Sequence, residues 1–119
     1  MLKVEKMHID GYVFGRIIID SKTYTTDVII YPERVDSSWW RKEGHYLNKE
    51  DLPGIVGAKP DILVIGTGNT GVMQVPEGTI KYFEEHGIEV HVAKTGKAVE
   101  IFNELSAGKK VIGAFHLTC

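Results

Sequence analysis

The sequence predicts an α/β domain with a three-layer arrangement and a mixed, mainly parallel central sheet of about five strands. In the first third of the chain, β-branched runs alternate with turn residues, as in a β-hairpin. From residue 60 on, strand-like apolar runs alternate with helical periodicity, which favours helical crossovers on a mostly parallel sheet. We expect one domain over 1–119, with an N-terminal hairpin at 13–31 and a β-α-β-α-β unit at 61–116.

Two β-rich runs predict the hairpin. Val13–Ile19 is rich in β-branched residues, Asp20–Lys22 has the composition of a turn, and Thr23–Tyr31 resumes the strand pattern. Pro32 ends the second run because proline has no backbone N–H to donate.

The next segment has little periodicity. Residues 33–47 fit neither a helix nor a strand. A short helix is expected after them, capped by Asn48 and stopped by Gly57. Its apolar stripe would consist of Leu52, Ile55 and Val56.

The three strands of the second half differ in pattern. Ile62–Ile65 is continuously apolar, as in a strand covered on both faces. Ile88–Val92 alternates, which places it near a sheet edge, and Val111–Phe115 is the last strand.

Two helices are expected between these strands. The first begins at Pro76 and stops at Gly87. The second is capped by Thr95 and ends at Gly108.

Composition excludes several function classes. The 119 residues include 14 basic and 16 acidic side chains, so a net charge of −2 gives no electrostatic reason to expect nucleic acid or an anionic membrane as partner. The single cysteine cannot form an internal disulfide. No apolar run approaches the roughly 20 residues of a membrane span. We expect a cytoplasmic location, and nothing here indicates the oligomeric state.

A glycine loop follows the first buried strand. Gly66-Thr67-Gly68-Asn69-Thr70-Gly71 fits G-x-G-x-x-G, in which backbone N–H groups approach a pyrophosphate. The next helix, however, begins five residues beyond the last glycine, and the next strand leads into Lys94 rather than an acid. We therefore expect no dinucleotide cofactor. The loop either binds another anion, with Lys94 adding charge and the free N–H groups near Thr95 facing the same space, or is simply a turn.

The most unusual composition lies in residues 39–45. Trp39 and Trp40 cannot both face the core if this segment is extended. Tryptophan and arginine are typical interface anchors, and Arg41 could bind a carboxylate or phosphate. In the alternative interpretation, one indole packs on the sheet and Arg41 pairs with an acid such as Asp27 or Glu43.

No pattern predicts catalysis or a metal site. His116 and Cys119 would point to opposite faces of an extended chain end, which does not suit a cysteine nucleophile. Glu89 and His91 are alone as candidate ligands, because no H-x-x-x-H or C-x-x-C pair occurs. There is no G-x-S-x-G elbow. We predict no catalytic residue, metal or cofactor.

Four motifs in order carry a resemblance over nearly the whole chain: Thr25-x-Asp27, Trp40-Arg41-x-x-Gly44-His45, Leu63–Gly68 and His116–Cys119. The chain resembles a small α/β domain family of archaeal and bacterial hypothetical proteins. That family includes the human adipogenesis-associated domain-containing protein and the mitochondrial complex I assembly factor three. The resemblance implies a mixed five-stranded sheet with one antiparallel strand, its first two strands forming the hairpin. It also implies assembly or regulatory roles, but no catalytic residue or cofactor.

Two function hypotheses follow. The first is a non-enzymatic, protein-binding or assembly-type factor. The second is a small protein or enzyme that binds an anionic ligand through the glycine loop and nearby basic residues, with His45 as acid/base. Both place one site at an electropositive hollow formed by Trp39, Trp40, Arg41, Lys42, His45, Gly66, Thr67, Gly68, Gly71, Lys94 and Thr95.

Overall fold

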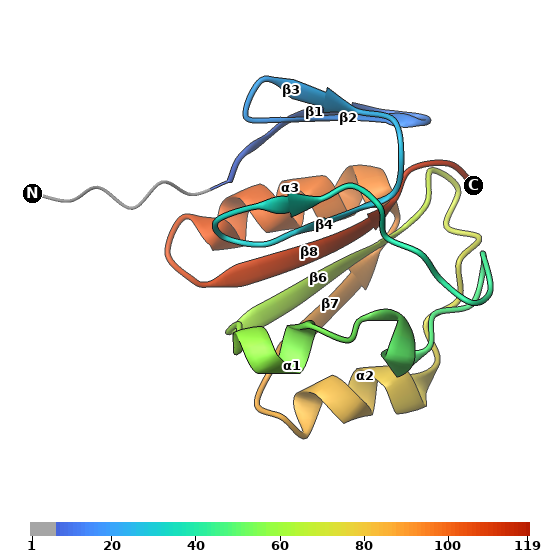
Figure 1. The fold of residues 1–119 in the computed structure, drawn as a ribbon, viewed down its shortest axis with the longest axis vertical. Helices are drawn as coiled ribbons and strands as arrows, with labels where there is room; N and C mark the ends of the chain where they lie inside the picture. The colour runs from blue at the N-terminus through green and yellow to red at the C-terminus, as the bar shows by residue number, and fades with distance from the viewer. Residues whose placement is uncertain (1–6) are drawn as a thin grey trace, which may run out of the picture.

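Two β-sheets and three α-helices make up the fold of this computed structural model, which describes residues 7–119 (Figure 1). Residues 1–6 of the expected domain lie outside the described residues. The antiparallel small sheet consists of β1 (Ile9–Val13), β2 (Arg16–Ile19) and β3 (Lys22–Tyr24). The large sheet has the order β5-β4-β8-β6-β7. Its strands are β4 (Val28–Ile30), β5 (Val35–Asp36), β6 (Ile62–Thr67), β7 (Glu89–Ala93) and β8 (Val111–His116).

The large sheet has five strands and is mixed, as predicted; two of its four strand pairings are parallel and two are antiparallel. β8 lies at its centre, parallel to β6 and antiparallel to β4, and β6 runs parallel to β7. β4 is therefore the strand that runs against its neighbours, β5 and β8. β7 lies at an edge, as its alternating pattern predicted.

Part of the predicted hairpin is confirmed, because β2 and β3 pair antiparallel across the turn at Asp20 and Ser21. The first run is interrupted by a turn at Phe14 and Gly15, between β1 and β2. The expectation that the hairpin supplies the first two strands of the large sheet is wrong, because only the end of its second run enters that sheet. The run Thr23–Tyr31 breaks at residues 25–27; β3 precedes the break in the small sheet and β4 follows it in the large sheet. Asp27 lies in the break, where its carboxylate accepts hydrogen bonds from other segments (described below). The three-layer arrangement stays a prediction.

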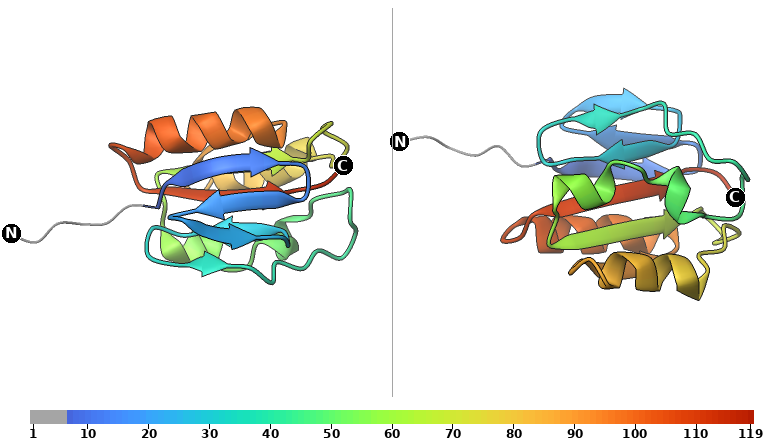
Figure 2. Two further views of the ribbon diagram at one scale, coloured as in Figure 1. Left: turned by 90° about the horizontal axis from the view of Figure 1, so that it is seen from above. Right: turned by 60° about the horizontal axis from the view of Figure 1, so that its bottom comes forward.

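Apolar side chains form a core on each face of the large sheet. Figure 2 shows α3 and α1 on opposite sides of that sheet. One core combines β1 and β2 with α3 (Thr95–Ser106), and Ile17, Phe102 and Val64 belong to it. The other combines α1 (Ile55–Ala58) and α2 (Glu77–Glu84) with alternate residues of β6, Leu63 and Ile65. This division follows from the two-residue period of a strand.

Helix boundaries differ from the predictions at four places. The helix expected at 48–57 is split into a 3₁₀ helix, Lys49–Asp51, and α1, with Pro53 between them, because proline cannot continue the hydrogen-bond pattern. α1 runs through Gly57 and ends at Ala58; Lys59 follows as its C-cap, with a φ of 51°. α3 is preceded by Lys94 as its cap rather than capped by Thr95, and it ends at Ser106, before Gly108. Within residues 7–119, no helix is long and apolar enough to cross a membrane.

Candidate functional site

Several candidate residues meet at the carboxyl ends of β6 and β8. Because these strands are parallel and Thr67 pairs with His116, the glycine loop 66–71 and the segment His116–Cys119 leave the same edge of the sheet. The loop of residues 37–46 also reaches this edge (Figure 1). We call His116–Cys119 the C-terminal segment and its surroundings the carboxyl edge.

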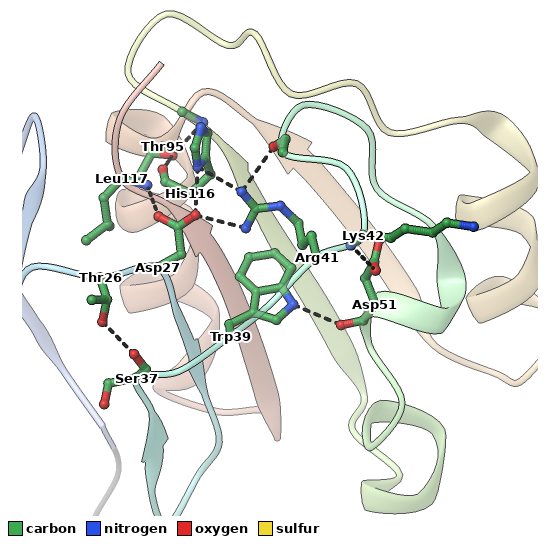
Figure 3. Close-up of polar contacts among 12 residues, drawn as sticks. Thr26, Asp27, Ser37, Trp39, Arg41, Lys42, Asp51, Thr95, His116 and Leu117 are labelled. Carbon is green, nitrogen blue, oxygen red and sulfur yellow. Dashed lines mark hydrogen bonds and ion pairs between the residues drawn. The ribbon is translucent and has the colours of Figure 1, made fainter.

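A buried cluster of Asp27, Arg41 and His116 lies at the carboxyl edge (Figure 3). The Asp27 Oδ2 atom lies 2.8 Å from His116 Nδ1 and 2.9 Å from Arg41 Nη1. Its Oδ1 atom accepts a 2.8 Å hydrogen bond from the Leu117 N–H. Arg41 Nη2 donates to the Gly44 carbonyl at 3.0 Å. The cluster therefore joins the break at residues 25–27, the 37–46 loop and the C-terminal segment.

The cluster is nearly closed to solvent. The side chains of Arg41, His116 and Asp27 are 6%, 7% and 19% exposed. Arg41 Nη2 and Asp27 Oδ2 both lie near His116 Nδ1, at 3.2 and 2.8 Å. Since ionised Asp27 can only accept, the shorter contact requires the proton on Nδ1, and Arg41 Nη2 then donates to the Gly44 carbonyl rather than to His116. Arg41 Nε and His116 Nε2 are buried and find no hydrogen-bond partner within the part of the chain that the structure describes. The ring of His45 meets His116 edge-on, with centroids 5.7 Å apart.

Two opposing effects set the pKa of Asp27. Burial raises this pKa, but hydrogen bonds from His116 and the Leu117 N–H, the charge of His116 and the hydrogen bond from Arg41 together outweigh burial and hold the pKa below its usual value. Asp27 is thus an ionised structural partner near neutral pH rather than a proton donor. The nearby Tyr12, whose hydroxyl donates to the Leu117 carbonyl, has a raised pKa because of its burial and the Asp27 charge.

The two adjacent tryptophans have different environments. Trp39 is buried, and its Nε1 donates to the Asp51 carbonyl at 2.8 Å. The Arg41 guanidinium carbon lies 4.6 Å from the Trp39 ring centroid, a cation–π contact. Trp40 points outward and is 75% exposed. The observed arrangement is thus the one in which one indole is buried and Arg41 pairs with Asp27. The main-chain N–H of Lys42 donates to the Asp51 carboxylate.

The C-terminal segment fills the glycine loop. The N–H groups of Asn69 and Val72 donate to the main-chain oxygens of Thr118 and Cys119 at 2.6 and 3.0 Å. Gly68 has φ +108°, and a Cβ there would lie 2.3 Å from the Cys119 carbonyl carbon. Main-chain donors that an anion would need are therefore bound to the chain itself.

Thr95 and Lys94 connect the loop to α3. Thr95 Oγ1 donates to the His116 carbonyl at 2.6 Å and accepts from the Gly68 N–H at 2.8 Å. Lys94 is exposed and lies across Gly71, where an added Cβ would come within 3.1 Å of the Lys94 Cγ. The structure thus gathers the candidate residues at one edge, but Arg41 faces Asp27 and His116, and Lys94 faces the glycine loop.

Sequence reasoning missed the central role of Asp27 and Leu117. Asp27 was expected only as one of two partners for Arg41, and the Leu117 main chain carries no sequence signal. The Thr25-x-Asp27 motif was the available indication. Within residues 7–119, no group of three or more histidine, cysteine or acidic side chains could hold a metal ion.

The fold and this buried Asp-His-Arg cluster define a small mixed α/β protein whose C-terminal segment closes its own glycine loop. The chain belongs to the family described as "Protein of unknown function (DUF498/DUF598)", whose model matches residues 9–116. This confirms the family resemblance carried by the four motifs.

Solved structures share the fold. The conserved hypothetical protein PH1505 from Pyrococcus horikoshii is 28% identical, with a TM-score of 0.79 over 93% of this chain and 98% of that chain. A Bartonella henselae structure described as an outer membrane protein is 22% identical, with a TM-score of 0.79 over 98% of each chain. A Mth938-like domain from Bordetella pertussis is 18% identical, with a TM-score of 0.76 over 98% of this chain and 89% of that chain. For the two structures below 25% identity, the similarity concerns the fold alone. The cytoplasmic location of this protein stays a prediction.

Proposed function

We propose that this protein is a non-enzymatic, protein-binding factor of the assembly type, and that its partner contacts the carboxyl edge. The observation that carries the proposal is Trp40, which is 75% exposed while its neighbours Trp39 and Arg41 are buried and bound. Tryptophan is among the residues that contribute most to binding at protein interfaces. A side chain held out from a fixed backbone loses little conformational entropy on binding.

Other exposed apolar side chains belong to segments that meet at the same edge. Phe14 is 57% exposed in the β1–β2 turn, where the Gly15 N–H donates to the Leu117 carbonyl. The Val72 side chain is exposed, and its main-chain N–H donates to the Cys119 main-chain oxygen. Exposed apolar surface of this kind is typical of protein interaction sites. We define the interaction surface as Val13, Phe14, Trp40, Tyr46 and Val72.

The anion-binding alternative has weaker support. The N–H groups of Gly68, Asn69 and Val72 all donate within the chain, and Arg41 is paired with Asp27. Of the basic candidates at this edge, Lys94 is exposed beside the loop. Lys42 is exposed as well, but its side chain points away from the cluster (Figure 3). Exposed lysines without converging backbone donors make a poor anion site.

Affinity purification from the native cell tests the proposal, with quantitative mass spectrometry of wild type, Trp40→Ala and Val92→Ala. Val92 is a matched control because it is an exposed apolar residue on the edge strand β7. We expect Trp40→Ala to weaken capture of a specific protein by about 30-fold, the effect of a 2 kcal/mol contribution to binding. Val92→Ala should retain it, and neither variant should change the melting temperature. Equal capture by all three proteins would contradict the proposal.

A further inference from the structure

An apolar groove lies at the amino end of β8, away from the interaction surface. Its floor includes Met7, Pro32, Phe102 and Val111, and its volume is about 330 Å³. This volume falls at the lower end of the range for small-molecule sites, roughly 300–1,000 Å³. Since β8 has six residues, the groove and the carboxyl edge are separated by about 17 Å of strand.

Two lysines give one side of the groove a positive charge. Lys109 and Lys110 are the ionisable side chains among the lining residues, although the chain as a whole carries a net charge of −2. The Lys110 ammonium donates to the Ala58 carbonyl, and the Asp61 carboxylate accepts from the Lys110 N–H. Lys109 is exposed and, within residues 7–119, its ammonium has no ion pair or hydrogen bond. Lys109 is therefore the cation that remains available to a ligand.

We propose that this groove binds a single-chain amphiphile with a carboxylate head group. The alkyl chain would lie along Phe102 and Val111, where it loses contact with water, and the carboxylate would pair with Lys109. An apolar floor with a few polar groups at one side is the usual design of a small-ligand site. Charge complementarity favours a carboxylate over a cationic or neutral head group. The proposal is independent of the interaction surface.

Calorimetric titration of the full chain with octanoate, decanoate and decyltrimethylammonium tests the proposed site. Each amphiphile is used below the concentration at which it self-associates. Each additional buried methylene contributes about 0.8 kcal/mol, so affinity should rise about fourfold per methylene from octanoate to decanoate. Decanoate should bind more tightly than decyltrimethylammonium. No binding by any member of the series, or equal affinity for the two head-group charges, would overturn the proposal.

Three variants locate the site. Lys109→Gln should abolish the preference for the carboxylate while retaining the dependence on chain length. Ser106→Phe, which places a large side chain at the groove wall, should weaken decanoate binding at least tenfold. Lys97→Gln, at an exposed lysine on α3 outside the lining, should leave binding unchanged, as should Trp40→Ala. Unchanged decanoate binding in Ser106→Phe would place the ligand elsewhere and refute the groove as its site.

Discussion

Asp27 accepts hydrogen bonds on both carboxylate oxygens, and its three donors come from two segments that are far from it in the sequence: Arg41, and the adjacent residues His116 and Leu117. An ion pair of this kind contributes little net free energy compared with a well-packed apolar replacement, because burying charges is costly. Loss of one partner lowers the free energy of unfolding strongly, because the other charge stays buried without a partner. The arrangement therefore favours one geometry of the carboxyl edge more than it adds overall stability.

The first prediction concerns Asp27→Asn. At neutral pH we expect the free energy of unfolding to fall by about 3 kcal/mol, because Arg41 would keep a buried charge without its carboxylate. The pKa of Asp27 is lowered in the folded protein, so its stabilising contribution is complete above the unfolded pKa, near 4, and is lost as the pH falls through the folded pKa. The difference between wild type and variant should therefore shrink below pH 4.

Urea unfolding at a series of pH values measures this difference. Glu84→Gln, an exposed acid on α2, is the control and should change stability by less than about 0.5 kcal/mol. A constant difference between wild type and Asp27→Asn from pH 7 to pH 2 would mean that the Asp27 charge is not the origin of the effect.

At the scale of elements, the glycine loop 66–71 serves to accommodate another part of the chain. Its main chain passes so close to the C-terminal segment that an added Cβ at Gly68 would clash with Cys119 and approach His116 Cδ2 to 2.9 Å. The hydroxyl of Thr95 completes the contact by bridging the Gly68 N–H and the His116 carbonyl. A pattern that resembles a phosphate loop is therefore explained by packing within the protein.

The second prediction follows for Gly68→Ala. The variant combines backbone strain at a positive φ with overpacking against main-chain atoms, which together cost about 3 kcal/mol of unfolding free energy. Gly78→Ala in α2 is the matched control, because a Cβ there meets no atom within 4 Å and alanine favours helix. It should stabilise the protein by about 0.5–1 kcal/mol. Thermal and urea unfolding of both variants distinguish the effects; equal stability of the two would refute this explanation of the loop.

At the scale of the whole molecule, the predictable parts of the fold were those with a strong local signal. The strands at Ile62–Ile65 and at residues 88–92 were predicted correctly. A strand that is covered on both faces has a continuous apolar run, and a strand that is covered on one face has an alternating pattern. The break at Asp27 left no such pattern, since it depends on Arg41 and His116, 14 and 89 residues away. Likewise, the filling of the glycine loop depends on main-chain atoms of Thr118 and Cys119, which any residue type could supply.

The C-terminal segment makes polar contacts with three regions at this edge. The Leu117 carbonyl accepts from the Gly15 N–H in the β1–β2 turn, while its N–H donates to Asp27. The oxygens of Thr118 and Cys119 accept from Asn69 and Val72. Segments joined in this way open cooperatively when the joining segment is released.

The last prediction tests this cooperativity by amide hydrogen exchange. In Asp27→Asn, the amides of Gly15, Asn69 and Val72 should all exchange at least tenfold faster. Their acceptors are oxygens of the C-terminal segment, which the Asp27 carboxylate holds through the Leu117 N–H. The Asp61 amide, which donates to Lys110 at the opposite end of the sheet, should lose less protection. Faster exchange at Leu117 alone would show that Asp27 acts locally, and the proposed interaction surface would then rest on loops that move independently.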